Sequence, residues 1–144
     1  MIDEALLGIL LRITGLGMVS LAFVHLPISR SLAWNEDVKK LKPENEAVFR
    51  SHLFFLCLGL TLLGIALLVG APAFVERSEL GKWISGMLLV FWLMRLYRQW
   101  FGFPQQLWRG KPFETRIHWV FTLVWTAVVA VFACLFVWQM EWIP

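Results

Sequence analysis

Three histidines stand near the ends of apolar stretches in this sequence, where an imidazole could bind a metal ion or form a hydrogen bond. His25 lies at the end of the first apolar stretch, His52 at the start of the second, and His118 at the start of the last. Neutral imidazole is a common ligand of zinc and iron, and it also binds haem iron axially. Glu114 precedes His118 by four residues, so a helix would present both on one face. These four residues are candidate metal ligands.

Arg95 and Gln99 form a second polar pair, one helical turn apart, at the end of the third apolar stretch. A charged side chain at the centre of a membrane helix costs about 2.5 to 3.5 kcal/mol on insertion scales, and such residues commonly mark functional sites. The pair could bind the propionates of a haem, or the head group of an anionic lipid or quinone. The alternative is that Arg95 extends along its helix to the lipid head groups and has no specific ligand.

The composition is that of an integral membrane protein. Of 144 residues, 59% are apolar and only 16% are charged, against about 25% charged in soluble domains. Nine Trp and twelve Phe accompany a single Tyr, and this aromatic content is typical of side chains that face lipid or lie at the membrane interface. The net charge of +3 comes from basic residues dispersed over short connections, so nucleic acid is not predicted as a partner.

Four apolar stretches are long enough to cross a bilayer as helices. A hydrocarbon layer of about 30 Å needs about 20 residues at 1.5 Å per residue. Strands are a poor alternative because the stretches are continuous, and an open sheet would leave unpaired backbone groups in lipid. We therefore predict an all-α integral membrane protein, a single four-transmembrane-helix bundle over residues 1–144. The predicted spans are about residues 5–26, 46–69, 80–101 and 114–140.

Prolines set the predicted boundaries of two spans. Pro27 is expected to end the first span and Pro72 the second, because proline lacks the N–H that continues a helix. The second helix is expected to begin ahead of its span, at Pro43, because proline is favoured at the first helical position and Glu44 and Glu46 would occupy the favourable first turn.

Residues 31–42 connect the first two spans. In this segment Trp34, Val38 and Leu41 recur at helical spacing among charged residues, which favours a short amphipathic helix on the membrane surface. An ordinary solvated loop is an equally good interpretation of the same pattern.

The distribution of Lys and Arg predicts the orientation. Only Arg77 and Lys82 flank one side of the predicted spans, and Arg12 lies within the first span. By the positive-inside rule, the other, more basic side faces the cytoplasm and both termini lie outside it, an N-out/C-out arrangement. We expect the protein in a bacterial cytoplasmic (inner) membrane. The ten basic residues on the cytoplasmic side are Arg30, Lys39, Lys40, Lys42, Arg50, Arg95, Arg98, Arg109, Lys111 and Arg116.

The topology places all three histidines, the Arg95–Gln99 pair and Glu114 at one membrane level. Helical spacing also predicts that the histidines and the Arg95–Gln99 pair face inward, because each continues a stripe of small, polar or aromatic residues, and Glu114 shares the face of His118. These stripes are Gly8, Gly15, Met18 and Ala22 with His25; Asn45, Gly59 and Ala66 with His52; Ser85, Leu88 and Trp92 with Arg95 and Gln99; and Thr122 and Trp125 with His118.

The leading hypothesis is a cytoplasmic-leaflet pocket that binds a metal such as zinc or iron, haem b, or the head group of an anionic lipid or quinone. In one alternative, the histidines only form hydrogen bonds within the bundle. In another, the chain is a non-catalytic accessory or assembly subunit that packs on other membrane subunits or on a second copy. Whether it is an enzyme stays open, and the sequence contains no Gly-rich phosphate loop, no Ser-His-Asp order and no paired buried carboxylates. The predicted pocket consists of His25, His52, Arg95, Gln99, Glu114 and His118.

Overall fold

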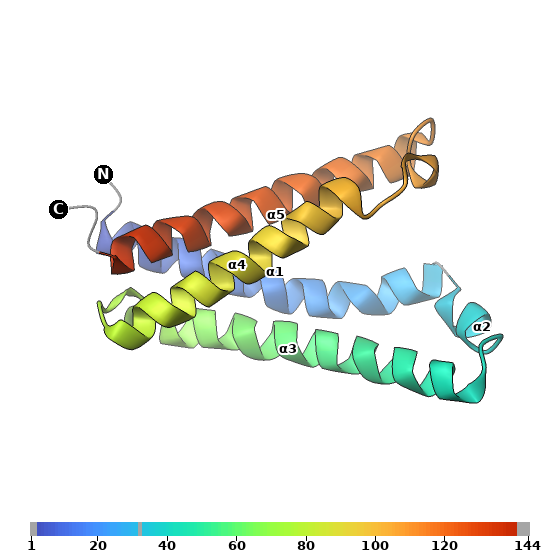
Figure 1. Cartoon of the computed structure of the whole chain (residues 1–144), viewed down its shortest axis with the longest axis horizontal. Helices are drawn as coiled ribbons and strands as arrows, with labels where there is room; N and C mark the ends of the chain where they lie inside the picture. The colour runs from blue at the N-terminus through green and yellow to red at the C-terminus, as the bar shows by residue number, and fades with distance from the viewer. Residues whose placement is uncertain (1–2, 32, 141–144) are drawn as a thin grey trace. The chain divides into compact units, whose positions relative to one another are not determined.

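The computed structural model describes residues 3–31 and 33–140, and the long elements in these residues are all α-helices (Figure 1). Residues 1–2, Leu32 and 141–144 lie outside the described residues, although the predicted domain 1–144 includes them and the predicted surface segment 31–42 includes Leu32. The elements are α1 (Glu4–Ser31), α2 (Trp34–Val38), α3 (Pro43–Val75), α4 (Glu79–Phe101), the 3₁₀ turn η1 (Gln105–Leu107) and α5 (Pro112–Gln139).

Three of these helices are long and apolar enough to cross a membrane. They cover Glu4–Arg30 in α1, Pro43–Val75 in α3 and Pro112–Gln139 in α5. This confirms the all-helical class and supports a lipid environment for these helices. The fourth long helix, α4, has 23 residues and is more polar, because it contains Lys82, Arg95 and Arg98 within its length.

The prolines do not end the helices as predicted. Helix α1 continues through Pro27 to Ser31, and α3 continues through Pro72 to Val75, so both predicted boundaries were wrong. Proline removes one backbone donor, but its fixed φ is compatible with helical geometry, and the helix resumes when its later groups find partners. The predicted helix start at Pro43 is confirmed.

The chain divides into two compact units. The first consists of Met1–Leu10 and Pro72–Pro144, and therefore contains the start of α1, the last turn of α3, and all of α4 and α5. The second consists of Leu11–Ala71, which contains the remainder of α1, α2 and most of α3.

In the first unit, α4 and α5 lie side by side and run antiparallel (Figure 1). Their shared core contains Trp92, whose ring stacks on Trp125 at a centroid distance of 5.4 Å and lies parallel to Phe132 at 6.4 Å. All three side chains are buried. Stacked aromatic rings therefore hold the middle of this helix pair.

In the second unit, α1 and α3 cross at two glycines. A Cβ atom on Gly15 would lie 2.6 Å from the Gly64 carbonyl oxygen, and one on Gly64 would lie 2.7 Å from the Gly15 carbonyl oxygen. Only glycine at both positions lets the two backbones approach this closely. The buried face of α3 beside this crossing includes Leu60 and Leu67.

The predicted inward stripe of α3 was therefore wrong. His52, Asn45, Gly59 and Ala66 are all exposed, because α3 presents the face that carries Gly64 to α1. Spacing alone allowed either face, since both carry small residues.

The short helix α2 is anchored to the start of α3. Val38 is buried, and the Trp34 ring meets Phe49 edge-on at 5.9 Å. Asn35 Oδ1 accepts a hydrogen bond from Arg50 Nη1 at 3.3 Å. The predicted helix in this segment is thus confirmed for its five central residues, and its position on a membrane surface stays a prediction.

The connection between α3 and α4 is held by Gln139 at the end of α5. Its Oε1 accepts from the backbone N–H of Ser78 at 3.1 Å, and its Nε2 donates to the carbonyls of Phe74 and Glu76 at 2.8 and 2.9 Å. The Gln139 side chain is fully buried, and its amide lies where a Cβ on Gly81 would clash. One side chain therefore satisfies three backbone groups of the turn.

Trp138 adds a fourth contact to the same connection. Its Nε1 donates to the Val75 carbonyl at 2.8 Å, and the Arg77 guanidinium lies over its ring at 4.5 Å. These contacts satisfy helix-end carbonyls of α3, which explains why the helix continues past its proline.

Replacing Gly64 by alanine should destabilise the protein by about 1–3 kcal/mol, because the new methyl group meets backbone atoms of α1 that cannot move aside. The free energy of unfolding in mixed detergent–SDS micelles measures this effect. The matched control is Gly59→Ala on the same helix, where a Cβ has no neighbour within 4 Å. Equal losses for the two variants would contradict the close crossing.

Replacing Gln139 by leucine should lower the free energy of unfolding by at least about 2 kcal/mol, because a backbone N–H and two carbonyls lose their partner in a buried position. Unfolding in mixed detergent–SDS micelles measures this loss of stability as well. Gln106→Leu is the control, since that glutamine is exposed on η1. A Gln139→Leu protein as stable as the control would rule out this role.

Candidate functional site: a donor-rich cluster between α4 and α5

Local structure at the α4–α5 connection brings the end of one helix beside the start of the next. Gly102 ends α4 with its N–H bonded to the Arg98 carbonyl at 2.9 Å. Gly110 adopts a φ of 81°, a left-handed conformation that favours glycine, and Pro112 then begins α5. Thr115 Oγ1 donates to the Trp108 carbonyl at 2.6 Å, which fixes the connection against the first turn of α5.

Three polar side chains form a chain of hydrogen bonds between the two helices. Arg95 Nη1 donates to Gln99 Oε1 at 3.3 Å. Gln99 Nε2 lies 3.2 Å from His118 Nδ1 and 3.4 Å from the His118 carbonyl oxygen. Gln99 and His118 are buried, and Arg95 is half-buried. The inward stripes predicted for α4 and α5 are thus confirmed at these positions.

The partners of Arg95 among the described residues are neutral. Besides Gln99, its guanidinium contacts the face of Trp125, with the carbon Cζ 4.5 Å from the ring centroid. The salt bridges found among the described residues all lie elsewhere, and none includes Arg95. A guanidinium has five N–H donors, so most of its hydrogen-bonding capacity is not used by Gln99.

Aromatic rings surround this chain of bonds. Trp108, from the connection, stacks on the His118 ring at 4.3 Å with the two planes 5° apart. Near the end of α4 and the start of α5, the rings of Trp100 and Trp119 meet edge-on with their centroids 5.8 Å apart. The Trp108 indole therefore covers a face of the His118 imidazole, and a ligand would reach this ring at its edge.

Three indole N–H groups in this region have no acceptor among the described residues. They belong to Trp92, Trp108 and Trp125, and each Nε1 atom is buried. Only 2% of Trp92 and 5% of Trp125 are exposed. Buried donors are nearly always hydrogen-bonded, and one left without a partner costs about 1–3 kcal/mol. These three tryptophans, Arg95, Gln99 and His118 form what we call the α4–α5 cluster. Its indole N–H groups and the Arg95 guanidinium give it more hydrogen-bond donors than acceptors.

The other predicted site residues lie apart from these contacts. Glu114 is exposed on the first turn of α5. His25 and His52 belong to the second unit, where His25 is half-buried with Nδ1 2.8 Å from the Leu21 carbonyl oxygen and His52 is exposed on α3. The structure therefore brings together Arg95, Gln99 and His118.

Among the described residues, no three His, Cys, Asp or Glu side chains form a group that could hold a metal ion. The predicted ligand set takes His25 and His52 from one unit and His118 and Glu114 from the other. A metal or haem b site built from these residues stays a prediction.

Sequence reasoning missed the role of the tryptophans. Trp92 and Trp125 lay on the predicted inward stripes, and their alignment with Arg95 and His118 was the available signal. Trp108 lies in an irregular connection, where no periodic pattern indicates which way a side chain faces. Its stacking on His118 is visible only in the structure.

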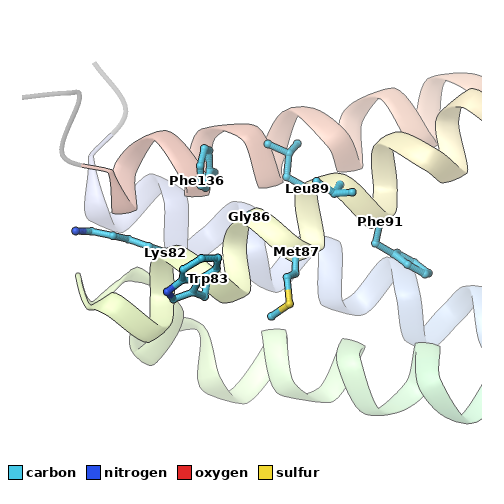
Figure 2. A pocket seen from close by; sticks show the side chains of 8 residues that line it. Lys82, Trp83, Gly86, Met87, Leu89, Phe91 and Phe136 are labelled. Carbon is cyan, nitrogen blue, oxygen red and sulfur yellow. The ribbon is translucent and has the colours of Figure 1, made fainter.

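A groove along α4 is lined by residues between 82 and 91, ahead of Arg95 and Gln99 on the helix (Figure 2). It encloses about 640 Å³ and is lined by apolar side chains such as Trp83, Met87 and Phe136, with Lys82 the only charged one. Figure 2 shows Lys82 pointing away from Phe91, at the opposite end of the lining. The groove offers apolar surface but no group of donors.

No protein-family model, curated protein or solved structure matches the chain, so the functional interpretation depends on the geometry of the α4–α5 cluster.

Proposed function

We propose that the protein is a four-span membrane protein whose α4–α5 cluster binds the head group of an amphiphile through oxygen acceptors, as in an anionic phospholipid or a quinone. The observation that carries the proposal is the half-buried Arg95, whose partners among the described residues, Gln99 and the Trp125 ring, are neutral. The same cluster holds three buried indole N–H groups that have no acceptor in this part of the chain. Phosphate and quinone carbonyl oxygens supply the hydrogen-bond acceptors that this cluster lacks.

The chemistry of the cluster favours an acceptor over a metal ion. A metal ion binds to atoms that have a free lone pair, such as a neutral imidazole nitrogen or a carboxylate oxygen. Arg95 and the indoles offer only N–H donors. A guanidinium also repels a nearby cation. Arginine, in contrast, commonly binds phosphate and carboxylate groups through two parallel hydrogen bonds.

The pairing of α4 with α5 supports α4 as the fourth span. Gln139 at the end of α5 contacts the start of α4, and His118 near the start of α5 contacts Gln99 near the end of α4. The two helices therefore accompany each other over roughly 27 Å, at 1.5 Å per residue between Gly81 and Gln99. If α5 crosses the bilayer, α4 crosses beside it.

The proposed orientation places the cluster at the inner leaflet. Ten Lys and Arg residues flank the spans on the side of the α2 and η1 connections, which fits both termini outside and an inner-membrane location. Arg95 then lies close to the head-group level, within reach of a lipid or quinone that remains in the leaflet.

Accessibility labelling of single-cysteine variants tests the topology. In a cysteine-free background, an impermeant maleimide added to intact spheroplasts should label Glu79→Cys but leave Asn35→Cys and Gln106→Cys unlabelled. In sealed inside-out vesicles, Asn35→Cys and Gln106→Cys should react and Glu79→Cys should not. After solubilisation all three variants should react. Labelling of Asn35→Cys and Gln106→Cys from opposite sides would contradict the four-span arrangement.

Replacing Arg95 by glutamine should reduce the amount of co-purifying amphiphile by about tenfold or more, because a charge-assisted hydrogen bond is lost. Mass spectrometry of extracted phospholipid and chromatography of extracted quinone measure the two ligand sources separately. Lysine at this position should restore part of the binding through its charge.

Arg98→Gln provides the matched control, since Arg98 is exposed one turn away on the same helix and packs over Gly102. It should retain the ligand at the level of the unaltered protein. Equal retention by the two glutamine variants, or an unaltered protein that carries neither phospholipid nor quinone above the level of bulk lipid, would refute the proposed function.

A further inference from the structure

The amide of Gln99 has only one orientation that fits its neighbours. Its Oε1 faces Arg95, which can only donate hydrogen bonds. Its Nε2 faces the backbone carbonyl oxygen of His118, which can only accept them. Rotating the amide by half a turn would place two donors together on one side and two acceptors together on the other. Two independent contacts therefore fix the same orientation.

This orientation determines the tautomer of His118. The Gln99 NH₂ group also faces His118 Nδ1 at 3.2 Å, so Nδ1 must be the acceptor. In a neutral imidazole one nitrogen accepts and the other carries the proton, which leaves the hydrogen on Nε2. His118 thus presents an N–H donor on the edge of the ring that faces away from Gln99.

We infer that Gln99 is the residue that sets the ligand class of the α4–α5 cluster, because its contacts with Arg95 and with the His118 backbone fix His118 as a hydrogen-bond donor through Nε2. The part of this inference that concerns the ligand rests on the proposed function. The part that concerns the tautomer of His118 depends only on the hydrogen bonds of Gln99. Gln99 acts through His118 and is a positioning residue. The site then takes oxygen acceptors, such as phosphate or a quinone carbonyl.

A carboxylate at position 99 would reverse this chemistry. The side chain of Gln99→Glu has the same shape, and one of its oxygens could still accept from Arg95. The second oxygen would face His118 Nδ1 as an acceptor, and it would draw a proton onto that nitrogen. The charge of Arg95 would also gain a carboxylate partner and would no longer be available to an anionic ligand.

The tautomer is measured by NMR of the full-length protein in micelles with ¹⁵N-labelled histidine rings, at about pH 8 so that free imidazole is neutral. In the unaltered protein, His118 should show an unprotonated Nδ1 and a protonated Nε2. In Gln99→Glu, the Nδ1 resonance should move into the protonated range. The His118→Gln variant, which lacks these cross-peaks, assigns them among the three histidines.

The chain provides a matched control in Gln105, which accepts from Arg109 Nη1 at 3.1 Å, four residues away. The hydrogen bonds found for histidine rings in the described residues do not include Gln105. Gln105→Glu should leave the His118 resonances unchanged. Gln99→Met, which keeps the bulk without a polar group, should give a mixture of the two tautomers, and it keeps the test valid if Gln99→Glu fails to fold.

Ligand retention supplies the second measurement. Gln99→Glu should retain about tenfold less phospholipid or quinone than the unaltered protein, and Gln105→Glu should retain the same amount. A protonated Nδ1 in the unaltered protein, or a His118 signal unaffected by both substitutions of Gln99, would overturn the inference. A correct tautomer without any retained ligand would instead refute the proposed function and leave the role of Gln99 in setting the tautomer intact.

Discussion

A buried hydrogen-bond donor must find an acceptor inside the protein when no water is near, and this constraint governs both ends of the α4–α5 pair. At one end, every polar atom of the Gln139 amide is used by backbone groups of the α3–α4 connection. From the middle of the pair toward the other end, Arg95 and the indoles of Trp92, Trp108 and Trp125 offer more donors than their neighbours accept. The first end is a complete structural contact, and the second is suited to binding an acceptor.

Glutamine has opposite roles at these two ends for a simple geometric reason. Its amide carries a donor group and an acceptor on one rigid plane, so each neighbour that can only donate or only accept fixes its orientation. Gln139 uses this property to tie a turn to a helix end. Gln99 uses it to connect a guanidinium to an imidazole, and the orientation of one amide then decides which edge of His118 carries the proton.

The two units differ in what holds their helices together. In Leu11–Ala71, the crossing of α1 and α3 depends on the absence of side chains at Gly15 and Gly64. In the unit that contains α4 and α5, large stacked rings such as Trp92 and Trp125 pack between the helices, and the Trp125 ring lies against Arg95. Close backbone contact leaves no room for a ligand, whereas an aromatic layer with polar edges provides both apolar surface and donors.

The sequence by itself determined the all-helical class, the presence of helices long and apolar enough to cross a membrane, and the inward faces of α4 and α5, because hydrophobic length and helical period act locally. It could not place the ends of α1 and α3, since contacts distant in sequence let a helix continue past Pro72. The face of α3 was likewise decided by the Gly15–Gly64 crossing, which left His52 exposed. Only the tertiary structure placed Trp108 on His118 and Gln99 between Arg95 and His118, because hydrogen-bond direction depends on neighbours that no spacing rule specifies.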